Sequence, residues 1–181
     1  MKLSEEDAEL FYELWLPLLD YVNKKKGANK KLRHIRMTGS LEPAEVKKVA
    51  DVLWKDTALI DEYLADNKDI EENNKEIISG WKRRVNGTFV VERILKKGAV
   101  FISLEDGNIY QVSGIVSSWE EMLEPVYLPL AVKAVLIPFR GVIITDGLIQ
   151  PCNVIIGRNM AKSFKEDYMK AKNNGMIRQQ L

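Results

Sequence analysis

The chain has 181 residues, of which 46% are hydrophobic and 29% are charged, and these fractions are ordinary for a globular protein. Its formal net charge of +1 gives no overall attraction to nucleic acid or to an anionic membrane. It contains no run of about 18 apolar residues, as a membrane-spanning helix would need. Its first residues are acidic, unlike those of a signal peptide, and its single cysteine cannot form an internal disulfide. We therefore expect a cytoplasmic protein with no membrane segment.

The N-terminal part of the chain predicts three amphipathic helices. Apolar residues recur with helical spacing over residues 5–25, which predicts the first helix. A second helix should start near Pro43, with a break near Thr57, because proline is favoured in a first helical turn. A third should follow the acidic segment 69–72, and we expect Trp81, which lies on its apolar stripe, to be buried.

From residue 86 onward the apolar period changes from 3.6 to 2, which indicates strands. Two Asp-Gly pairs, at 106–107 and 146–147, predict tight two-residue hairpin loops in which glycine takes a positive φ. Lys96-Lys97-Gly98 should form a three-residue loop of the same kind. The predicted strands cover residues 88–95, 99–104, 109–113, 134–137, 142–145, 148–150 and 154–156.

Two further helices complete the prediction. Ser117/Ser118 with Glu120/Glu121 should cap a short helix inserted among the strands. Asn159 should cap a final helix that ends at Asn174-Gly175, after which residues 176–181 should fray. The sequence thus predicts an α+β fold: an N-terminal three-helix segment packed on a small antiparallel sheet or partly closed β-barrel, with a C-terminal helix. We expect a helical subdomain over 1–85 and a β subdomain over 86–181.

The segments WKRRVNGTFVVERILKKGAVFISL and FRGVIITDGLI resemble uncharacterised bacterial proteins that combine helices with a β segment. In some members of that family a cysteine-rich SEC-C zinc tail accompanies the segment. This chain has no such tail, so zinc binding does not carry over. The resemblance covers about the last 100 residues and implies a fold, with no assigned activity.

No set of residues in the sequence predicts a catalytic or metal centre. His34 is the only histidine and lies in a basic run, and Cys152 follows a proline at a predicted strand edge. One histidine and one cysteine cannot supply the ligands of a zinc site. The acidic residues decorate predicted helix surfaces, and the glycines form no phosphate-binding motif. We expect no catalytic residue, no cofactor and no metal, although Gly157-Arg158-Asn159 before the final helix could receive an anion.

The charge distribution is the one uneven feature. Residues 24–36 form a basic connector that we expect to be exposed, and they carry seven Lys or Arg and no acid. Residues 82–97 carry six bases and one acid. If these segments converged, they could bind phosphates; otherwise they pair with acidic helices or serve as soluble linkers. The candidate nucleic-acid-binding residues are Lys24, Lys25, Lys26, Lys30, Lys31, Arg33, Arg36, Arg83 and Arg84.

Three functions remain open from the sequence. The absence of a nucleophile, base or metal-ligand set favours a non-enzymatic binding or scaffold module of the bacterial cytoplasm, with a protein partner or a second copy. The first alternative is a nucleic-acid-associated protein that uses the basic segments. The second is an enzyme built from dispersed carboxylates and arginines, which converging acidic groups in a pocket would support.

Overall fold

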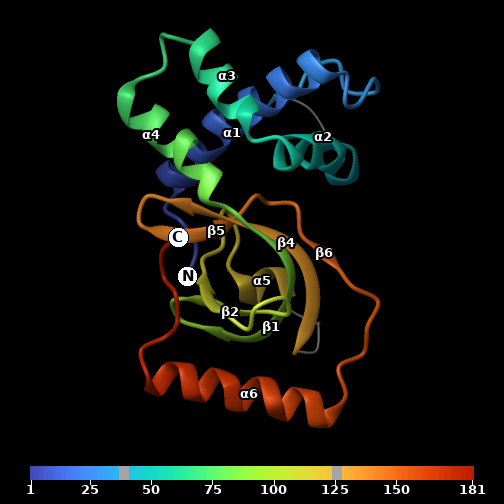
Figure 1. The fold of residues 1–181 in the computed structure, drawn as a ribbon, viewed down its shortest axis with the longest axis vertical. Helices are drawn as coiled ribbons and strands as arrows, with labels where there is room; N and C mark the ends of the chain where they lie inside the picture. Colours follow the sequence, from blue (N-terminus) through green and yellow to red (C-terminus); the bar gives the residue numbers. More distant parts are fainter. Residues whose placement is uncertain (37–40, 124–127) are drawn as a thin grey trace. The chain divides into compact units, whose positions relative to one another are not determined.

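The computed structural model describes residues 1–36, 41–123 and 128–181 and has an α+β fold (Figure 1). The chain divides into two compact units. Residues 5–82 form a helical unit, and residues 1–4 together with 83–181 form a sheet unit. Each unit is described by itself below.

The helical unit contains α1 (Glu5–Lys26), α2 (Pro43–Lys55), α3 (Ala58–Asp66) and α4 (Glu72–Gly80). The predicted break near Thr57 is present, and it separates the predicted second helix into α2 and α3. At this break the Asp56 N–H bonds to the carbonyl oxygens of both Val52 and Leu53 at 3.2 Å, which closes the last turn of α2. The described part of the helical unit therefore contains four α-helices where three were expected.

Aromatic side chains form much of the core of the helical unit. The rings of Trp15 and Trp54 stack with centroids 5.3 Å apart, which joins α1 to α2. Trp81 lies in a short 3₁₀ turn after α4 and meets Trp15 edge-on at 5.6 Å and Phe11 at 6.0 Å. Its side chain is fully buried, which confirms the expected burial. Edge-on and stacked aromatic contacts of this kind stabilise a core beyond the burial of their area.

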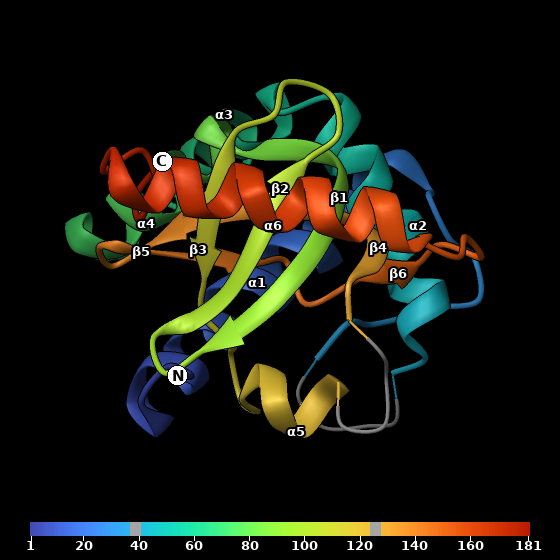
Figure 2. The same cartoon turned by 90° about the horizontal axis from the view of Figure 1, so that it is seen from below.

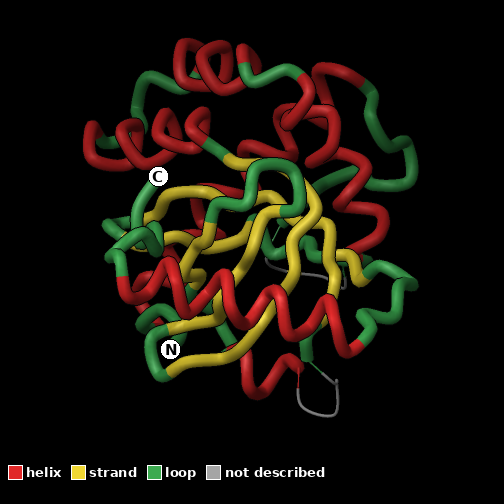
Figure 3. The backbone as a smooth tube through the Cα atoms, turned by 60° about the horizontal axis from the view of Figure 1, so that its bottom comes forward, coloured by secondary structure: helices red, strands yellow, loops and turns green. Residues whose placement is uncertain are grey.

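The sheet unit contains a six-stranded sheet in the order β1-β2-β3-β5-β4-β6. Its strands are β1 (Val85–Leu95), β2 (Gly98–Ser103), β3 (Ile109–Val112), β4 (Leu130–Phe139), β5 (Val142–Thr145) and β6 (Gln150–Pro151). Strand β1 pairs with β2 and also with β4, so the sheet curves partly into a ring (Figure 3). A bulge between Val91 and Arg93 interrupts the β1–β2 register, and such a bulge increases local twist and bend.

The prediction of an antiparallel sheet is wrong at one pairing. Strands β3 and β5 run parallel, with Val112 opposite Ile143. The reason is topological: β1, β2, β3, β5 and β4 follow one another around the ring, and an odd number of strands cannot alternate in direction throughout. At least one neighbouring pair must then be parallel, and the sheet is mixed.

Alternating side chains of the strands build two apolar clusters on opposite faces of the sheet. On β1, Phe89 and Val91 belong to the inner cluster, whereas Val90 belongs to the outer one. The inner cluster also contains Trp119 from α5 (Trp119–Leu123). The outer cluster also contains Tyr168 and Ala171 from α6 (Arg158–Asn173).

Helix α6 (Arg158–Asn173) crosses β1 and β2 on the outer face (Figure 2). It begins after Gly157, whose backbone is extended, so the predicted cap at Asn159 is wrong by two positions. Its predicted end at Asn174-Gly175 is confirmed: Met176 N–H bonds to Ala171 O at 2.8 Å and Gly175 N–H to Lys172 O at 3.3 Å, with Gly175 at φ 65°. This pair of bonds is the Schellman motif. The Ser118–Glu121 cap of α5 is confirmed as well, by reciprocal bonds of 2.6 and 3.3 Å.

The loops differ in length from the prediction. Gly107 and Gly147 have φ of 71° and 80°, as expected, but neither lies in a two-residue hairpin. The β2–β3 loop has four residues, because Ser103 and Asn108 are the last residues joined across it. After Gly147 the chain pairs with β4 and not with β5, so this turn connects no hairpin. Conversely, the β1–β2 loop has only two residues, since Leu95 pairs with Gly98.

Two terminal segments also depart from expectation. Residues 154–156 form no strand. Residues 176–181 do not fray: the chain leaves α6 and runs back along the sheet toward β5 (Figure 1), with Arg178 bridged to Tyr110 of β3. At the other end, Leu3 N–H bonds to Gly114 O at 3.0 Å, which joins residues 1–4 to the sheet unit. Backbone contacts with β3 and with Gly114, two residues after it, therefore hold the two terminal segments in place.

Candidate functional site

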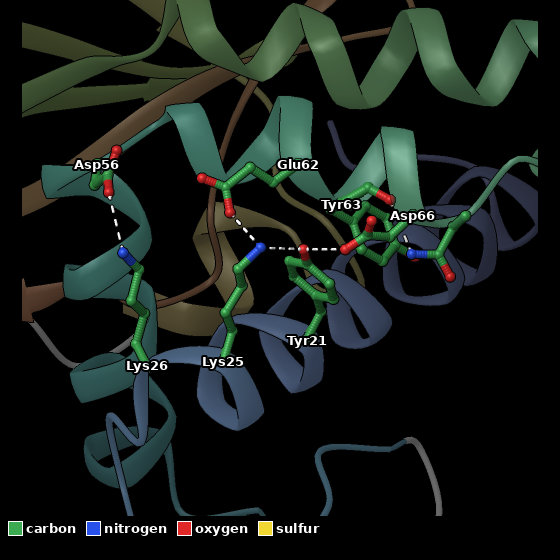
Figure 4. Close-up of polar contacts among 8 residues, drawn as sticks. Tyr21, Lys25, Lys26, Asp56, Glu62, Tyr63 and Asp66 are labelled. Carbon is green, nitrogen blue, oxygen red and sulfur yellow. Dashed lines mark hydrogen bonds and ion pairs between the residues drawn. The ribbon is translucent and has the colours of Figure 1, made fainter.

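The lysines at the start of the predicted basic connector lie in the last turn of α1. Lys24 is 2.5 Å from Asp20, one turn earlier on the same helix. Lys25 forms an ion pair with Glu62 of α3, and the Lys26 Nζ is 3.5 Å from Asp56 Oδ2 (Figure 4). Residues 24–26 are exposed, as expected, but they belong to α1, which continues through Lys26, and not to a connector. Each of these three cations faces a carboxylate of the same unit.

Lys25 is the centre of a polar network that links α1 to α3 (Figure 4). Its Nζ donates to the Tyr21 hydroxyl at 2.8 Å, and that hydroxyl donates to Asp66 Oδ2 at 2.6 Å. The hydrogen bond to Glu62 raises the pKa of Lys25, and burial together with the Asp66 contact raises the pKa of Tyr21. Both groups therefore keep their protons at neutral pH. The network therefore joins two helices through protonated Lys25 and Tyr21 and the carboxylates that face them.

The rest of the connector is organised by two buried asparagines. The Asn23 amide donates to the carbonyl oxygens of Asn29 and Leu32 at 3.1 and 2.8 Å, and its Oδ1 accepts from the Asn29 N–H at 2.7 Å. The Asn29 amide in turn donates to Glu45 Oε2 of α2 at 2.6 Å. Residues 27–36 are therefore tied to α1 and α2 through side-chain amides. This role of the asparagines was not predicted, because it depends on contacts between α1, residues 27–36 and α2 that form only in the folded unit.

Glu45 of α2 forms ion pairs with two further lysines. Lys48 lies 2.9 Å and Lys31 3.5 Å from its Oε1. The hydrogen bonds from Lys48 and Asn29 lower the pKa of Glu45 to about 2. Its carboxylate thus remains charged at any physiological pH and neutralises the basic residues around it.

The other candidate nucleic-acid-binding residues are divided between the two units. Lys30, Arg33 and Arg36 are exposed on the connector, whereas Arg83 and Arg84 belong to the sheet unit. The helical unit as a whole has 13 basic and 17 acidic residues, a net charge of −4, and the sheet unit has 14 and 9, a net charge of +5. The predicted basic segment 24–36 is thus set in an acidic unit.

The residues considered for metal or nucleophilic chemistry lie apart. His34 is exposed on the connector near Asp20, and Cys152 is half-buried beside β4, where its N–H bonds to Ala131 O at 2.8 Å. Among the described residues no three His, Cys, Asp or Glu side chains lie close enough to hold a metal ion.

One pocket of about 290 Å³ lies in the sheet unit, between the β2–β3 loop and the second half of α6. Ile102, Ile109 and Ala171 supply apolar lining, and these residues belong to the outer cluster. Asn108, Asp167 and Lys170 supply the polar groups, and Gly107 and Met176 complete the lining. The lining comes from three separate segments, so the pocket could not be predicted from any one of them.

An exposed apolar segment precedes and begins α6. Ile155 is 97% exposed, Val154 is 60% exposed, and Met160 in the first turn of α6 is 53% exposed. Exposed apolar residues scattered singly are normal, but contiguous ones indicate an interaction surface. Arg158 and Lys162 are exposed in the same segment, so the apolar side chains are flanked by positive charge. We call residues 154–162 the apolar–basic segment.

The neighbouring strand β6 is protected at its outer edge. Along a strand, the backbone N–H groups of successive residues point alternately toward one neighbour and the other. The Cys152 N–H bonds to β4, and Gln150 pairs with β4 in the same way, so an N–H at the position of Pro151, between them, would point away from the sheet. Proline has no N–H to donate, and its presence is a common protection of an edge strand. A partner at this side of the sheet would therefore bind side chains of the apolar–basic segment instead of adding a strand to β6.

Comparison of the chain with protein-family models, with curated proteins and with solved structures found no match. Within residues 1–36, 41–123 and 128–181, no helix has the length and apolar character needed to cross a membrane.

Proposed function

We propose that the protein is a non-enzymatic binding or scaffold module of the bacterial cytoplasm, and that its sheet unit binds a protein partner through the apolar–basic segment. The observation that carries the proposal is the near-complete exposure of Ile155 beside exposed Val154. Burying a fully exposed isoleucine stabilises a complex by about 1.5–3 kcal/mol, which makes such a residue a natural anchor.

The charges around the segment indicate the chemistry of the partner. Arg158 and Lys162 flank the apolar side chains, and the sheet unit carries a net charge of +5. Electrostatic complementarity favours a partner surface that is acidic around an apolar centre. A second copy of the chain and an unrelated protein are both compatible with this chemistry.

Site-specific photo-crosslinking tests the proposal. A photoreactive amino acid is placed at position 155 in the full chain and, as a matched control, at position 104, where Leu104 is 49% exposed in the β2–β3 loop. Irradiation in the native cell should give one dominant adduct from position 155 and none of the same mass from position 104. Identical patterns from the two positions, or no adduct from position 155, would refute the assignment of this surface.

The protein found in the adduct is then purified, and its affinity is measured for the wild type, for Ile155→Ser and for Leu104→Ser. Its affinity should fall by about tenfold or more for Ile155→Ser, in keeping with the loss of one apolar anchor. The control Leu104→Ser should bind as the wild type does. Since both side chains are exposed, neither change should lower the melting temperature by more than a degree or two.

A further inference from the structure

The pairing between β3 and β5 is short, and the C-terminal tail fills the space beside it. Here the tail means residues 176–181. Only Val112 pairs with Ile143 between these two strands, extended by one bond from Ser113 N–H to Ile143 O at 2.8 Å. From Ile109 to Gln111, before this pairing, the same edge of β3 is covered by the tail. Arg178 N–H donates to Ile109 O at 2.8 Å, and Gln111 N–H donates to Arg178 O at 2.9 Å. The tail therefore acts as a short parallel strand.

Side chains of the tail reinforce this pairing. The Arg178 guanidinium lies 5.7 Å from the ring centroid of Tyr110, a cation–π contact. Its charge also helps the Ser103 and Asn108 contacts to lower the pKa of Asp106 in the β2–β3 loop. Leu181 packs against the inner cluster and Ile177 against the outer one. The fit between tail and sheet thus involves backbone bonds, a charge and two apolar contacts.

The tail is nevertheless held less firmly than the strands around it. No side chain of residues 176–181 is buried: Ile177 and Leu181 are half-buried, and the others are exposed. Segments with few buried apolar contacts open at a free-energy cost far below that of global unfolding. When the tail leaves, Ile109 O and the Gln111 N–H lose their partners, and an open strand edge of this kind is a template for another strand.

We propose that the edge of β3 from Ile109 to Gln111 is a strand-acceptor site that binds residues 176–181 of a second copy in exchange for the chain's own tail. The occupant follows from the contacts above, since 176–181 is the sequence whose fit to this edge the structure shows. Gly175, at φ 65°, lies between α6 and the tail and can serve as the hinge. Reciprocal exchange of identical segments gives a closed two-fold dimer. This proposal is independent of the apolar–basic segment.

The test uses a fluorescent synthetic peptide with the sequence of residues 175–181 and the full-length protein. The variant Arg178→Pro removes the N–H that bonds to Ile109 O and so releases the protein's own tail, whereas Gln179→Ser is the matched control. Fluorescence anisotropy should show the peptide binding to Arg178→Pro roughly tenfold or more tightly than to the wild type or the control, because a site occupied in cis has a reduced apparent affinity. A peptide carrying Leu181→Asp should not bind.

Sedimentation of the wild-type chain tests directly whether a second copy supplies the tail, because such an exchange gives a dimer. A dimer should increase with concentration and be lost in the full-length variant Leu181→Asp. A chain that remains monomeric at every concentration, although the peptide binds, would overturn the second copy as the occupant. Absence of peptide binding to folded Arg178→Pro would overturn the acceptor site.

If Arg178→Pro fails to fold, hydrogen exchange of the wild type shows whether the tail leaves β3 without global unfolding. The Gln111 amide, which bonds to the tail, should exchange roughly tenfold or more faster than amides of β2, which is paired on both sides. Exchange of Gln111 at the β2 rate would show that the tail opens only on global unfolding, and would overturn the proposal.

Discussion

The guanidinium of Arg93 lies 4.1 Å from the ring centroid of Tyr168 and so connects β1 to α6 across the outer cluster. Its Nη2 also donates to Glu92 Oε1 at 2.9 Å, which holds the guanidinium in place. An arginine over an aromatic face is attracted by the ring quadrupole, and the attraction is stronger where the pair is partly desolvated.

We expect Arg93 and Tyr168 to be energetically coupled. A double-mutant cycle with Arg93→Met and Tyr168→Leu, measured by chemical denaturation, should give a coupling free energy of about 1 kcal/mol. As a control, the exposed pair Lys162–Glu166, 3.8 Å apart on α6, should give a coupling close to zero. Equal coupling energies for the two pairs would contradict the contribution of the cation–π contact.

Trp81 should be important for stability through packing alone. Its side chain is fully buried against Phe11 and Trp15, and its Nε1 has no hydrogen-bond partner among the described residues. Trp81→Ala should therefore lower the free energy of unfolding by about 3–5 kcal/mol. Trp81→Phe should cost much less, since it keeps an aromatic ring and breaks no hydrogen bond. Equal losses for the two variants in urea denaturation would contradict this account.

Two glycines with positive φ should respond differently to alanine. At Gly98, φ is 127° and an added Cβ would lie 2.3 Å from Val112 O, so the backbone itself would have to move. At Gly107, φ is 71° and nothing lies within 4 Å of an added Cβ, so only the conformational cost remains. Gly107→Ala should lower the free energy of unfolding by about 1 kcal/mol, and Gly98→Ala by several times as much. Thermal melts that rank the two variants in the opposite order would contradict the close approach of Gly98 to β3.

Glu45 should make the helical unit sensitive to acid. Its folded-state pKa is about 2, below its usual value, so its contribution to stability is fully present above the unfolded-state pKa near 4.3. That contribution is lost as the pH falls from there through about 2. Glu45→Gln should therefore flatten the dependence of stability on pH within this window. A dependence of stability on pH that is the same in Glu45→Gln as in the wild type would contradict this role of Glu45.

The nucleic-acid alternative makes a separate prediction. Reversing Lys24, Lys25 and Lys26 to Glu would place negative charges beside Asp20, Glu62 and Asp56 and should lower the melting temperature, so these variants cannot isolate a binding effect.

The exposed connector residues provide the cleaner test. If the basic connector binds phosphates, Lys30→Glu with Arg33→Glu should weaken retardation of duplex DNA, and the wild type should show a log–log salt slope of about −0.9 per neutralised phosphate. The control is Lys68→Glu, at a site outside the connector. Absence of any retardation by the wild type at low salt would eliminate this function.

The sequence by itself determined the local elements of this protein. The helical period of the first 85 residues, the change to period 2 near residue 86, and the glycines with positive φ depend on neighbours a few positions away. For the same reason the Ser118–Glu121 cap and the helix end at Gly175 were predictable. Local sterics and hydrogen bonds decide such features before any long-range contact forms.

Tertiary structure alone decided which basic residues are neutralised, how the sheet closes and where the tail lies. Tyr21 and Asp66 are 45 positions apart, and Lys25 meets Glu62 only because α3 packs beside α1. The parallel pairing of β3 with β5 follows from the number of strands in the ring, which no single strand encodes. Residues 176–181 were expected to fray because they are the last residues of the sequence, yet the edge of β3 gives their backbone hydrogen-bond partners. A strand edge exists only after the sheet has formed, so the fate of this tail could not be read from its own residues.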